Sequence, residues 1–312
     1  MFLANHQNAL LDALLIATHC KRKPYFLTRS DVFKTALLKV FFEFLQMIPV
    51  YRIRDGKNSL AGNTAIFERC AQLLGRGEAV LIFPEGNHSL KRRVRPLSKG
   101  FTRILFLALE SNPSMDIGIV PIGVNYANAA KFPDKAALYY GNEIRVRDFF
   151  DKKDVSGSAS RLKEEVYHHL KKLTTHIEEE SSYEEIVHTL DRAKVDYLDP
   201  AGVNRIIEEG TSPENRKIGK GKVGLMNYLF RGVFYILNFP MLIIWSRFIK
   251  PKVSEPEFLS TTRFMYALLF YPFFYLLFIA GMLEFLNWPA TSIICLAHLT
   301  LNIVLVKLSW ED

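Results

Sequence analysis

Short apolar runs alternate with amphipathic segments over the first 150 residues. Apolar runs that end at turn residues predict strands at 49–52, 79–83, 117–124 and 137–140. Apolar residues repeating every three to four positions predict helices at 10–20, 32–47, 61–74 and 101–110. This alternation predicts a layered α/β domain over residues 1–150. Pro121 lies inside the third strand, which predicts an edge strand or a bulge.

Residues 151–223 are more polar and nearly balanced in charge. A turn is expected at 156–160 and a charged amphipathic helix at 162–180, followed by polar, solvated helical chain with breaks at its prolines. Four histidines fall in this region: His168, His169, His176 and His188. Neighbouring residues on a helix cannot face one ligand, so we interpret the histidines as a solvated surface and expect no metal site.

Residues 224–312 have the pattern of a membrane-associated segment. Residues 264–283 and 286–306 contain no charged side chain, and each run is long enough to cross the hydrocarbon core. Basic residues flank the outer ends and are absent from the connector, which predicts a helix hairpin with both outer ends in the cytosol. A third apolar segment, 225–249, contains Arg231, Asn238 and Pro240. We expect it to form an interfacial or re-entrant helix pair in preference to a full span.

The net charge of +8 is concentrated in residues 1–150. Such a surplus attracts nucleic acid, anionic lipid or phosphorylated small molecules. Nucleic-acid binding rests on charge alone, because the basic run has no interleaved aromatic residues, and two predicted spans argue against it. The three cysteines are far apart and share no metal-type spacing, which is typical of reduced thiols in a cytosol-facing protein. The abrupt start, with only residues 2–4 available for a strand before His6, suggests an N-terminally truncated domain.

His6 and Asp12 are the first candidates for chemistry. A histidine can remove a proton from an alcohol near neutral pH, and a carboxylate partner can fix its tautomer. Side chains six residues apart in one regular helix face different directions, so they meet only if His6 lies in a turn before the helix that carries Asp12. The alternative is a loop histidine and a helix-capping aspartate.

The second candidate is the turn Phe83-Pro84-Glu85-Gly86, which directly follows a predicted buried strand. Its glycine permits close approach of a substrate to the backbone, and its glutamate can accept hydrogen bonds from a polyol. A basic run follows, with no acid among its members: Lys91, Arg92, Arg93, Arg95, Lys99 and Arg103. This run is either a phosphate site, a patch for anionic lipid or a solvated face.

Four blocks together resemble the glycerolipid acyltransferases, the family of glycerol-phosphate and lysophosphatidate acyltransferases. They are Asn5-His6-Gln7-Asn8 with Asp12, Ile48-Pro49-Val50-Tyr51-Arg52, Phe83-Pro84-Glu85-Gly86 and Val120-Pro121-Ile122. The resemblance covers residues 1–145. It implies a mixed α/β sheet flanked by helices at a membrane surface, to which the sequence adds a helical insert and a C-terminal membrane hairpin. It also implies acyl transfer from a CoA or acyl-carrier-protein thioester to a glycerophosphate hydroxyl.

Carried over by position, the resemblance makes His6 the general base and Asp12 its orienting carboxylate. Arg52 would bind the acceptor phosphate, and residues 83–86 would hold the glycerol phosphate. Residues 120–122 would shape the acyl-chain side. The commoner spacing places four residues between the histidine and the aspartate. Here there are five, so a bulged turn is expected.

A second departure affects the third block, in which Asn87-His88-Ser89 replaces the usual Thr-Arg-Ser. His88 or a residue from Lys91 to Arg93 would have to replace the missing arginine in substrate binding.

We therefore expect three parts: an acyltransferase domain at 1–150, a charged helical segment at 151–223 and membrane helices at 224–312. The expected activity is acyl transfer to glycerol 3-phosphate or its 1-acyl derivative in phospholipid synthesis, on the cytoplasmic face of a membrane. The acyl thioester would be a co-substrate, and no cofactor or metal is expected. The alternative is a catalytically inactive membrane protein that binds anionic lipid.

Overall fold

The computed structural model describes residues 1–30, 33, 36–51, 57–210 and 225–310. The described chain divides into two compact units. The first unit contains residues 1–127 and 135–213, and the second contains 128–134 and 214–312. Arg52, the predicted phosphate ligand, falls outside the described residues.

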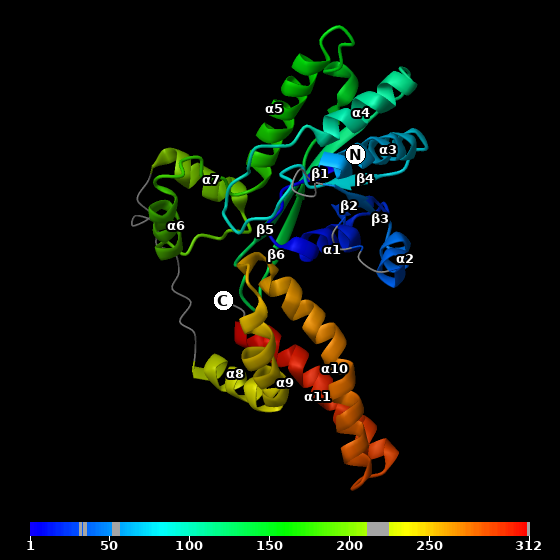
Figure 1. The fold of residues 1–312 in the computed structure, drawn as a ribbon. Coiled ribbons are helices and arrows are strands. Elements are labelled where there is room, and N and C mark those ends of the chain that lie inside the picture. The colour runs from blue at the N-terminus through cyan, green and yellow to red at the C-terminus, as the bar shows by residue number, and fades with distance from the viewer. Residues whose placement is uncertain (31–32, 34–35, 52–56, 211–224, 311–312) are drawn as a thin grey trace. The chain divides into compact units, whose positions relative to one another are not determined.

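The first unit contains one mixed sheet of seven strands, drawn in Figure 1. The strands are β1 (Phe2–Ala4), β2 (Tyr25–Arg29), β3 (Met47–Val50), β4 (Val80–Ile82), β5 (Gly118–Tyr126), β6 (Ala136–Tyr140) and β7 (Ile144–Arg145). Their order is β3-β2-β4-β1-β5-β6, and β7 also pairs with β5. The first five are parallel, and β6 and β7 run antiparallel to β5. The expected mixed α/β architecture is confirmed.

Seven helices belong to the described part of the first unit. They are α1 (Ala9–His19), α2 (Ala36–Phe44), α3 (Lys57–Gly75), α4 (Gly100–Ser111), α5 (Val155–Leu173), α6 (Tyr183–Arg192) and α7 (Pro200–Glu209). The main core joins α3, α4 and α5 to the strands, with Phe101, Ile104, Leu162 and Leu170 fully buried among them. A smaller core lies within α6, α7 and the chain around them. The described parts of α3, α4 and α5 are amphipathic because one stripe of each helix fills these cores.

Several helices predicted in the first unit begin or end at other residues in the structure. The helix expected to reach Met47 stops at Phe44, because Gln46 adopts a left-handed φ of 59° and Met47 enters β3. No turn forms at 156–160: Asp154 accepts a hydrogen bond from Gly157 N (2.8 Å) and caps α5 from Val155 onward. That helix ends at Leu173, seven residues before the expected end.

Three strands were not among those predicted, and of the two alternatives for Pro121, an edge strand or a bulge, the edge strand is wrong. β2 and β7 lack a long apolar run, and β1 has only three residues although it lies at the centre of the sheet. β5 is an interior strand, so Pro121 is not at an edge. On one side Pro121 pairs in register with Leu3. On the other side it lies between the segments that pair with β6 and β7, where no ladder bond needs its missing N–H.

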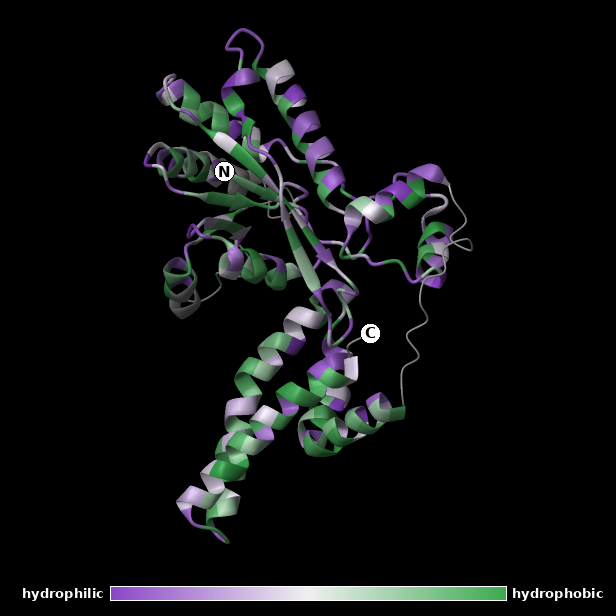
Figure 2. Cartoon of the chain, turned by 180° about the vertical axis from the view of Figure 1, so that it is seen from behind, coloured by the Kyte–Doolittle hydropathy of each residue, from purple (hydrophilic) through white to green (hydrophobic). Residues whose placement is uncertain are grey.

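The second unit is helical and apolar, as Figure 2 shows in green. Its helices are α8 (Leu225–Leu237), α9 (Phe239–Ile244), α10 (Leu259–Leu283) and α11 (Trp288–Trp310). Short helical turns at 245–252 and 256–258 join α9 to α10. By length and composition, residues 256–283 and 288–310 can each cross a membrane. The first helix begins earlier than predicted and includes Arg263, and Leu286 lies in the connecting turn instead of the second helix.

Candidate active site

His6 and Asp12 meet where β1 gives way to α1. His6 lies in the turn after the strand, and Asp12 is in the first turn of the helix. His6 Nδ1 is 2.7 Å from Asp12 Oδ2, and the Asp12 side chain is fully buried. Ala9 at the start of α1 adopts a left-handed φ of 38°. This conformation distorts the turn between His6 and Asp12, where the departure from the family spacing led us to expect an irregular turn.

Asp12 receives three further hydrogen bonds. The backbone N–H groups of Gln7 and Asn8 both donate to Oδ2, each at 2.8 Å. The Tyr126 hydroxyl, from the last residue of β5, donates to Oδ1 at 2.6 Å. Four donors on two oxygens fix the orientation of this buried carboxylate and satisfy its charge.

The His6 ring lies against the turn that follows β4. Its centroid is 4.1 Å from that of Phe83, with the two planes nearly parallel, and His88 packs edge-on against it at 5.6 Å. Ser89 N donates to the His6 carbonyl at 3.0 Å. Because Nδ1 is bonded to Asp12 and the ring is held on two sides, Nε2 is the nitrogen placed to exchange a proton with a substrate.

The Phe83–Gly86 segment is a tight turn, closed by a 3.1 Å hydrogen bond from Gly86 N to the Phe83 carbonyl. Gly86 has a φ of 72°, a conformation that residues with a Cβ rarely adopt. Ser98 N donates to the Pro84 carbonyl at 2.7 Å and ties the loop back to the chain before α4. The glycine is therefore required by the backbone of the turn, apart from any contact with a ligand.

Glu85 is buried beside the dyad and only half satisfied. Arg95 Nε donates to its Oε2 at 2.8 Å. Its other oxygen, Oε1, is buried and has no hydrogen-bond partner among the described residues. Burial raises the pKa of the Glu85 carboxyl to about 7, although the Arg95 guanidinium beside it acts in the opposite direction. An unpaired buried acceptor of this kind fits a donor from a ligand, such as a hydroxyl.

The basic run after this turn is largely used inside the first unit. Arg92 donates to the carbonyls of Tyr126 (3.0 Å) and Ala127 (2.8 Å), and its guanidinium lies 3.4 Å from the ring centroid of Tyr197. Lys91 and Arg93 both pair with the exposed Glu180. Arg92 thus holds the end of β5 from which Tyr126 reaches Asp12.

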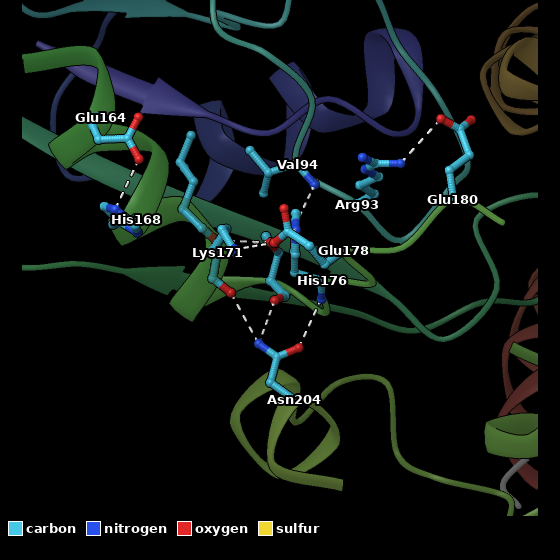
Figure 3. Close-up of polar contacts among 11 residues, drawn as sticks. Arg93, Val94, Glu164, His168, Lys171, His176, Glu178, Glu180 and Asn204 are labelled. Carbon is cyan, nitrogen blue, oxygen red and sulfur yellow. Dashed lines mark hydrogen bonds and ion pairs between the residues drawn. The ribbon is translucent and has the colours of Figure 1, made fainter. Parts of the chain in front are cut away.

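His176 contradicts the expectation of a solvated histidine. It is buried, and its Nδ1 accepts a 3.0 Å hydrogen bond from Val94 N (Figure 3). Its backbone N–H donates to Asn204 Oδ1, whose amide in turn donates to the carbonyls of Lys171 and Thr174. Burial, followed by the charge of Lys171, lowers the pKa of His176. No cluster of metal ligands occurs among the residues that the structure describes.

A groove of about 800 Å³ lies elsewhere in the first unit, between α3, α4 and α5. Phe67, Lys99, Arg103 and Phe106 are among its lining residues, which include neither His6 nor Glu85. It is therefore separate from the dyad.

The predicted site residues thus come together around one turn, with Arg52 outside the described part of the chain. His6, Asp12, Phe83, Glu85 and His88 are neighbours, and Lys91 follows on the same loop with its side chain directed to Glu180. Residues 120–122 pair with β1, the strand that delivers His6.

Sequence reasoning missed Tyr126 and the internal role of Arg92. Tyr126 lies two residues beyond the strand predicted at 117–124, and a tyrosine at that place is too common to single out a residue.

Part of this chain is similar to known proteins. The family model described as Acyltransferase matches residues 1–125. Glycerol-3-phosphate O-acyltransferase 2 of Saccharomyces cerevisiae is 32% identical over 84 residues, and Glycerol-3-phosphate O-acyltransferase 1 of the same yeast is 26% identical over 83. Each alignment covers 27% of this chain and 11% of the relative, so the matched region is a small part of those proteins.

Among solved structures, the 1-acyl-sn-glycerophosphate (LPA) acyltransferase PlsC from Thermotoga maritima is similar to this chain with a TM-score of 0.38 at 16% identity. The match covers 57% of this chain and 67% of PlsC. The family match begins at the first residue and takes in the dyad, the Phe83–Gly86 turn and all but the last residue of β5. Residues 1–125 are therefore the part of this chain that is similar to the acyltransferase family.

Proposed function

We propose that this chain is a membrane-associated O-acyltransferase, which moves an acyl group from a thioester to a hydroxyl of glycerol 3-phosphate. The observation that carries the proposal is the contact of His6 with both Asp12 and Phe83, beside the half-satisfied Glu85. The acceptor is chosen because the two yeast relatives bear the name glycerol-3-phosphate O-acyltransferase. Its 1-acyl derivative is the alternative acceptor, and acyl-CoA or acyl-carrier protein is the donor.

The chemistry follows from the dyad. His6 Nε2 takes the proton of the acceptor hydroxyl while that oxygen attacks the thioester carbonyl carbon. The tetrahedral intermediate expels the thiolate by breaking the C–S bond, and the protonated imidazole returns its proton to the sulfur. The products are an ester and a free thiol, and His6 ends neutral. A base of this kind contributes about 10²–10⁴-fold to the rate.

The surrounding groups have supporting roles in this proposal. Asp12 holds the imidazole and stabilises its protonated form, and Tyr126 keeps Asp12 in position. Glu85 Oε1 accepts a hydrogen bond from a glycerol hydroxyl. Arg52, His88 and Lys91 remain the proposed contacts for the acceptor phosphate. Residues 256–283 and 288–310 would keep the enzyme in the membrane, with the active site on its cytoplasmic face.

The experiment is an acyl-transfer assay on membranes that contain the full chain. Labelled acyl-CoA or labelled acyl-carrier protein is supplied, with glycerol 3-phosphate or its 1-acyl derivative as acceptor. We expect product with glycerol 3-phosphate, and none from membranes that lack the chain. Transfer to the 1-acyl derivative alone would correct the acceptor. The inactive lipid-binding alternative would be favoured if the chain binds vesicles of anionic lipid but forms no product with any combination of acyl donor and acceptor.

A further inference from the structure

The α8–α9 pair is bent by 83° at Asn238, between Leu237 and Phe239. A bent pair of this kind either crosses a membrane as a broken span or returns to the side from which it entered. Met226 and Lys252 lie near the two ends of the pair. A broken span places them on opposite sides of the membrane, whereas a re-entrant pair places them on the same side. The contacts that each arm makes with α10 and α11 distinguish them.

α10 and α11 form an antiparallel hairpin. The Tyr275 hydroxyl lies 2.8 Å from His298 Nδ1, and Phe278 also packs against the His298 ring. The chain reverses between Leu283 and Trp288. The first residues of α10 and the last residues of α11 therefore lie together, and we call this the open end of the hairpin.

α8 runs from the open end toward the middle of α11. Arg231 Nε donates to the Ser309 carbonyl at 2.9 Å, and the Phe234 ring lies 5.6 Å from that of Trp310. At the end of α8, the Leu237 carbonyl is 3.3 Å from His298 Nε2. The contacts thus move from the end of α11 to its middle.

α9 runs back along α10 to the same end. The Tyr271 hydroxyl donates to Asn238 Oδ1 at 3.1 Å, beside the bend. Tyr266 then donates to the Met241 carbonyl at 2.8 Å, and Arg263 lies 5.3 Å from the Trp245 ring. The contacts move from the middle of α10 to its start, so both arms of the pair lead to the open end.

Residues 128–134, which also belong to this unit, lie at the open end too. The Ser260 hydroxyl in the first turn of α10 donates to the Ala129 carbonyl at 2.6 Å, and the Arg263 guanidinium lies 5.7 Å from the Phe132 ring.

The bend is held by polar side chains from both neighbouring helices. Asn238 is buried, and its amide nitrogen donates to Asn302 Oδ1 (2.6 Å) and to the Phe234 carbonyl (2.9 Å). His298 Nε2 forms a hydrogen bond with the Leu237 carbonyl, which would otherwise have no partner at the bend. An unsatisfied backbone group is strongly unfavourable in hydrocarbon, so this network allows a bend to persist at membrane depth.

Most residues of the pair are hydrophobic, as the green colour of its ribbon in Figure 2 shows. Residues that are at least half exposed on it include Leu225, Met226, Tyr228, Leu229, Tyr235, Ile236, Phe239, Ile243 and Phe248. Asn302 and His298, which both contact the bend, precede the end of α11 by about 12 Å and about 18 Å. Both distances are shorter than a hydrocarbon core of about 30 Å, so the bend lies within the core and does not reach its far side.

We infer that α8 and α9 form a re-entrant hairpin whose partner is the acyl-chain layer of a single membrane leaflet. It enters from the open end, turns at Asn238 and leaves on the same side, while α10 and α11 cross the bilayer. The inference rests on the membrane association within the proposed function. It adds that the chain contacts one leaflet through a large apolar surface that does not cross the bilayer.

The test is side-specific labelling of the full chain in sealed proteoliposomes of known orientation. Single cysteines replace Met226, Lys252 and Glu284 in a chain whose three natural cysteines are removed, and a membrane-impermeant maleimide is added outside. We expect Met226→Cys and Lys252→Cys to react from the same side and Glu284→Cys only after the vesicles are opened, or the reverse in vesicles of opposite orientation. Trypsin cleavage after Lys252 in the unsubstituted chain provides a second readout that needs no variant.

Two results would overturn the inference. Labelling of positions 226 and 252 from opposite sides would make the pair a broken span. Labelling of position 284 from the same side as the other two would show that α10 and α11 do not cross. The labelling experiment measures topology and the acyl-transfer assay measures activity. Failure of this inference is therefore distinguishable from failure of the proposed function.

A matched pair of substitutions on α11 tests the polar network. Asn302→Leu removes the partner of Asn238, whereas Thr300→Leu removes a hydroxyl that bonds only within its own helix. We expect Asn302→Leu to lower the melting temperature in detergent by several degrees and to increase tryptic cleavage after Lys252, and Thr300→Leu to change neither. Equal effects of the two substitutions would show that the network does not hold the bend.

Discussion

His6 in the first unit and His298 in the second show how the same side chain serves two purposes. His6 uses one ring nitrogen to contact a buried carboxylate, and no described residue bonds the other. His298 uses both: Nδ1 contacts Tyr275 and Asn302, and Nε2 contacts the Leu237 carbonyl. A histidine with one anchored nitrogen and one open nitrogen can exchange a proton with a substrate, whereas one with both nitrogens engaged by neutral groups is a structural crosslink.

The largest expected effect comes from replacing each histidine in turn. His6→Ala should lower kcat for acyl transfer by about 10²–10⁴-fold, because the general base is lost, while the protein stays in the membrane fraction. His298→Ala should leave kcat per folded molecule within about twofold and lower the melting temperature. The control is His19→Ala, an exposed histidine at the end of α1. Near-normal turnover by His6→Ala would contradict the assignment of the base.

The second effect concerns Glu85. Glu85→Gln should lower kcat/KM for the acceptor by about 10–100-fold, because a charge-assisted hydrogen bond is worth about 1.5–3 kcal/mol. Glu78→Gln, an exposed change just before β4, is the control.

The ionisation of Glu85 can be followed by infrared spectroscopy. A protonated-carboxyl band should disappear as the pH rises through about 7 in the unsubstituted chain, and it should be absent in Glu85→Gln. The pKa of Glu85 is about 7 in the folded chain and 4.5 in its ordinary state, so the folded chain binds this proton more tightly than the unfolded chain. The protonated carboxyl therefore adds its full contribution to the free energy of unfolding below pH 4.5, and this contribution is lost as the pH rises through 7. A band that disappears near pH 4.5 would contradict the burial argument.

A smaller effect is expected at Tyr126. Tyr126→Phe removes one of the four donors to Asp12 and should lower kcat by about 3–20-fold with little change in KM. The acid limb of the pH–rate profile should also move to higher pH, because a carboxylate with one donor fewer holds the protonated imidazole more strongly. Tyr139→Phe, which removes a hydroxyl bonded to the Leu198 carbonyl, should change neither. An unshifted profile would reduce Tyr126 to a packing role.

The smallest effect is on pH-dependent stability. The pKa of His176 is lowered by burial, so its contribution to the free energy of unfolding is present above pH 6.5 and is lost as the pH falls below that value. His176→Asn keeps an acceptor for Val94 N and cannot titrate, so its melting temperature should fall less between pH 7 and 5, by about a few degrees. The control is His168→Asn, which breaks an exposed pair with Glu164, drawn in Figure 3, and an edge contact with the Tyr167 ring. Parallel curves for all three proteins would contradict the burial of His176.

The sequence by itself determined the class of the fold, the dyad and turn as candidates, and the two apolar helices. Each of these depends on residues that are close in the chain, where periodicity, an apolar run or a Pro-Glu-Gly turn is visible locally. Helix geometry also indicated that His6 must lie in a turn before the helix that carries Asp12, because side chains six residues apart in one regular helix face different directions.

Only the tertiary structure decided which groups complete the site and where the bent helix pair leads. Tyr126 reaches Asp12 across 114 residues, Arg92 reaches Ala127 across 35, and His298 reaches Leu237 across 61. None of these partners carries a local signal, because a hydrogen bond between distant residues is fixed by sheet order and helix packing. For the same reason, Pro121 could be placed inside the sheet only when the gap between β6 and β7 was known.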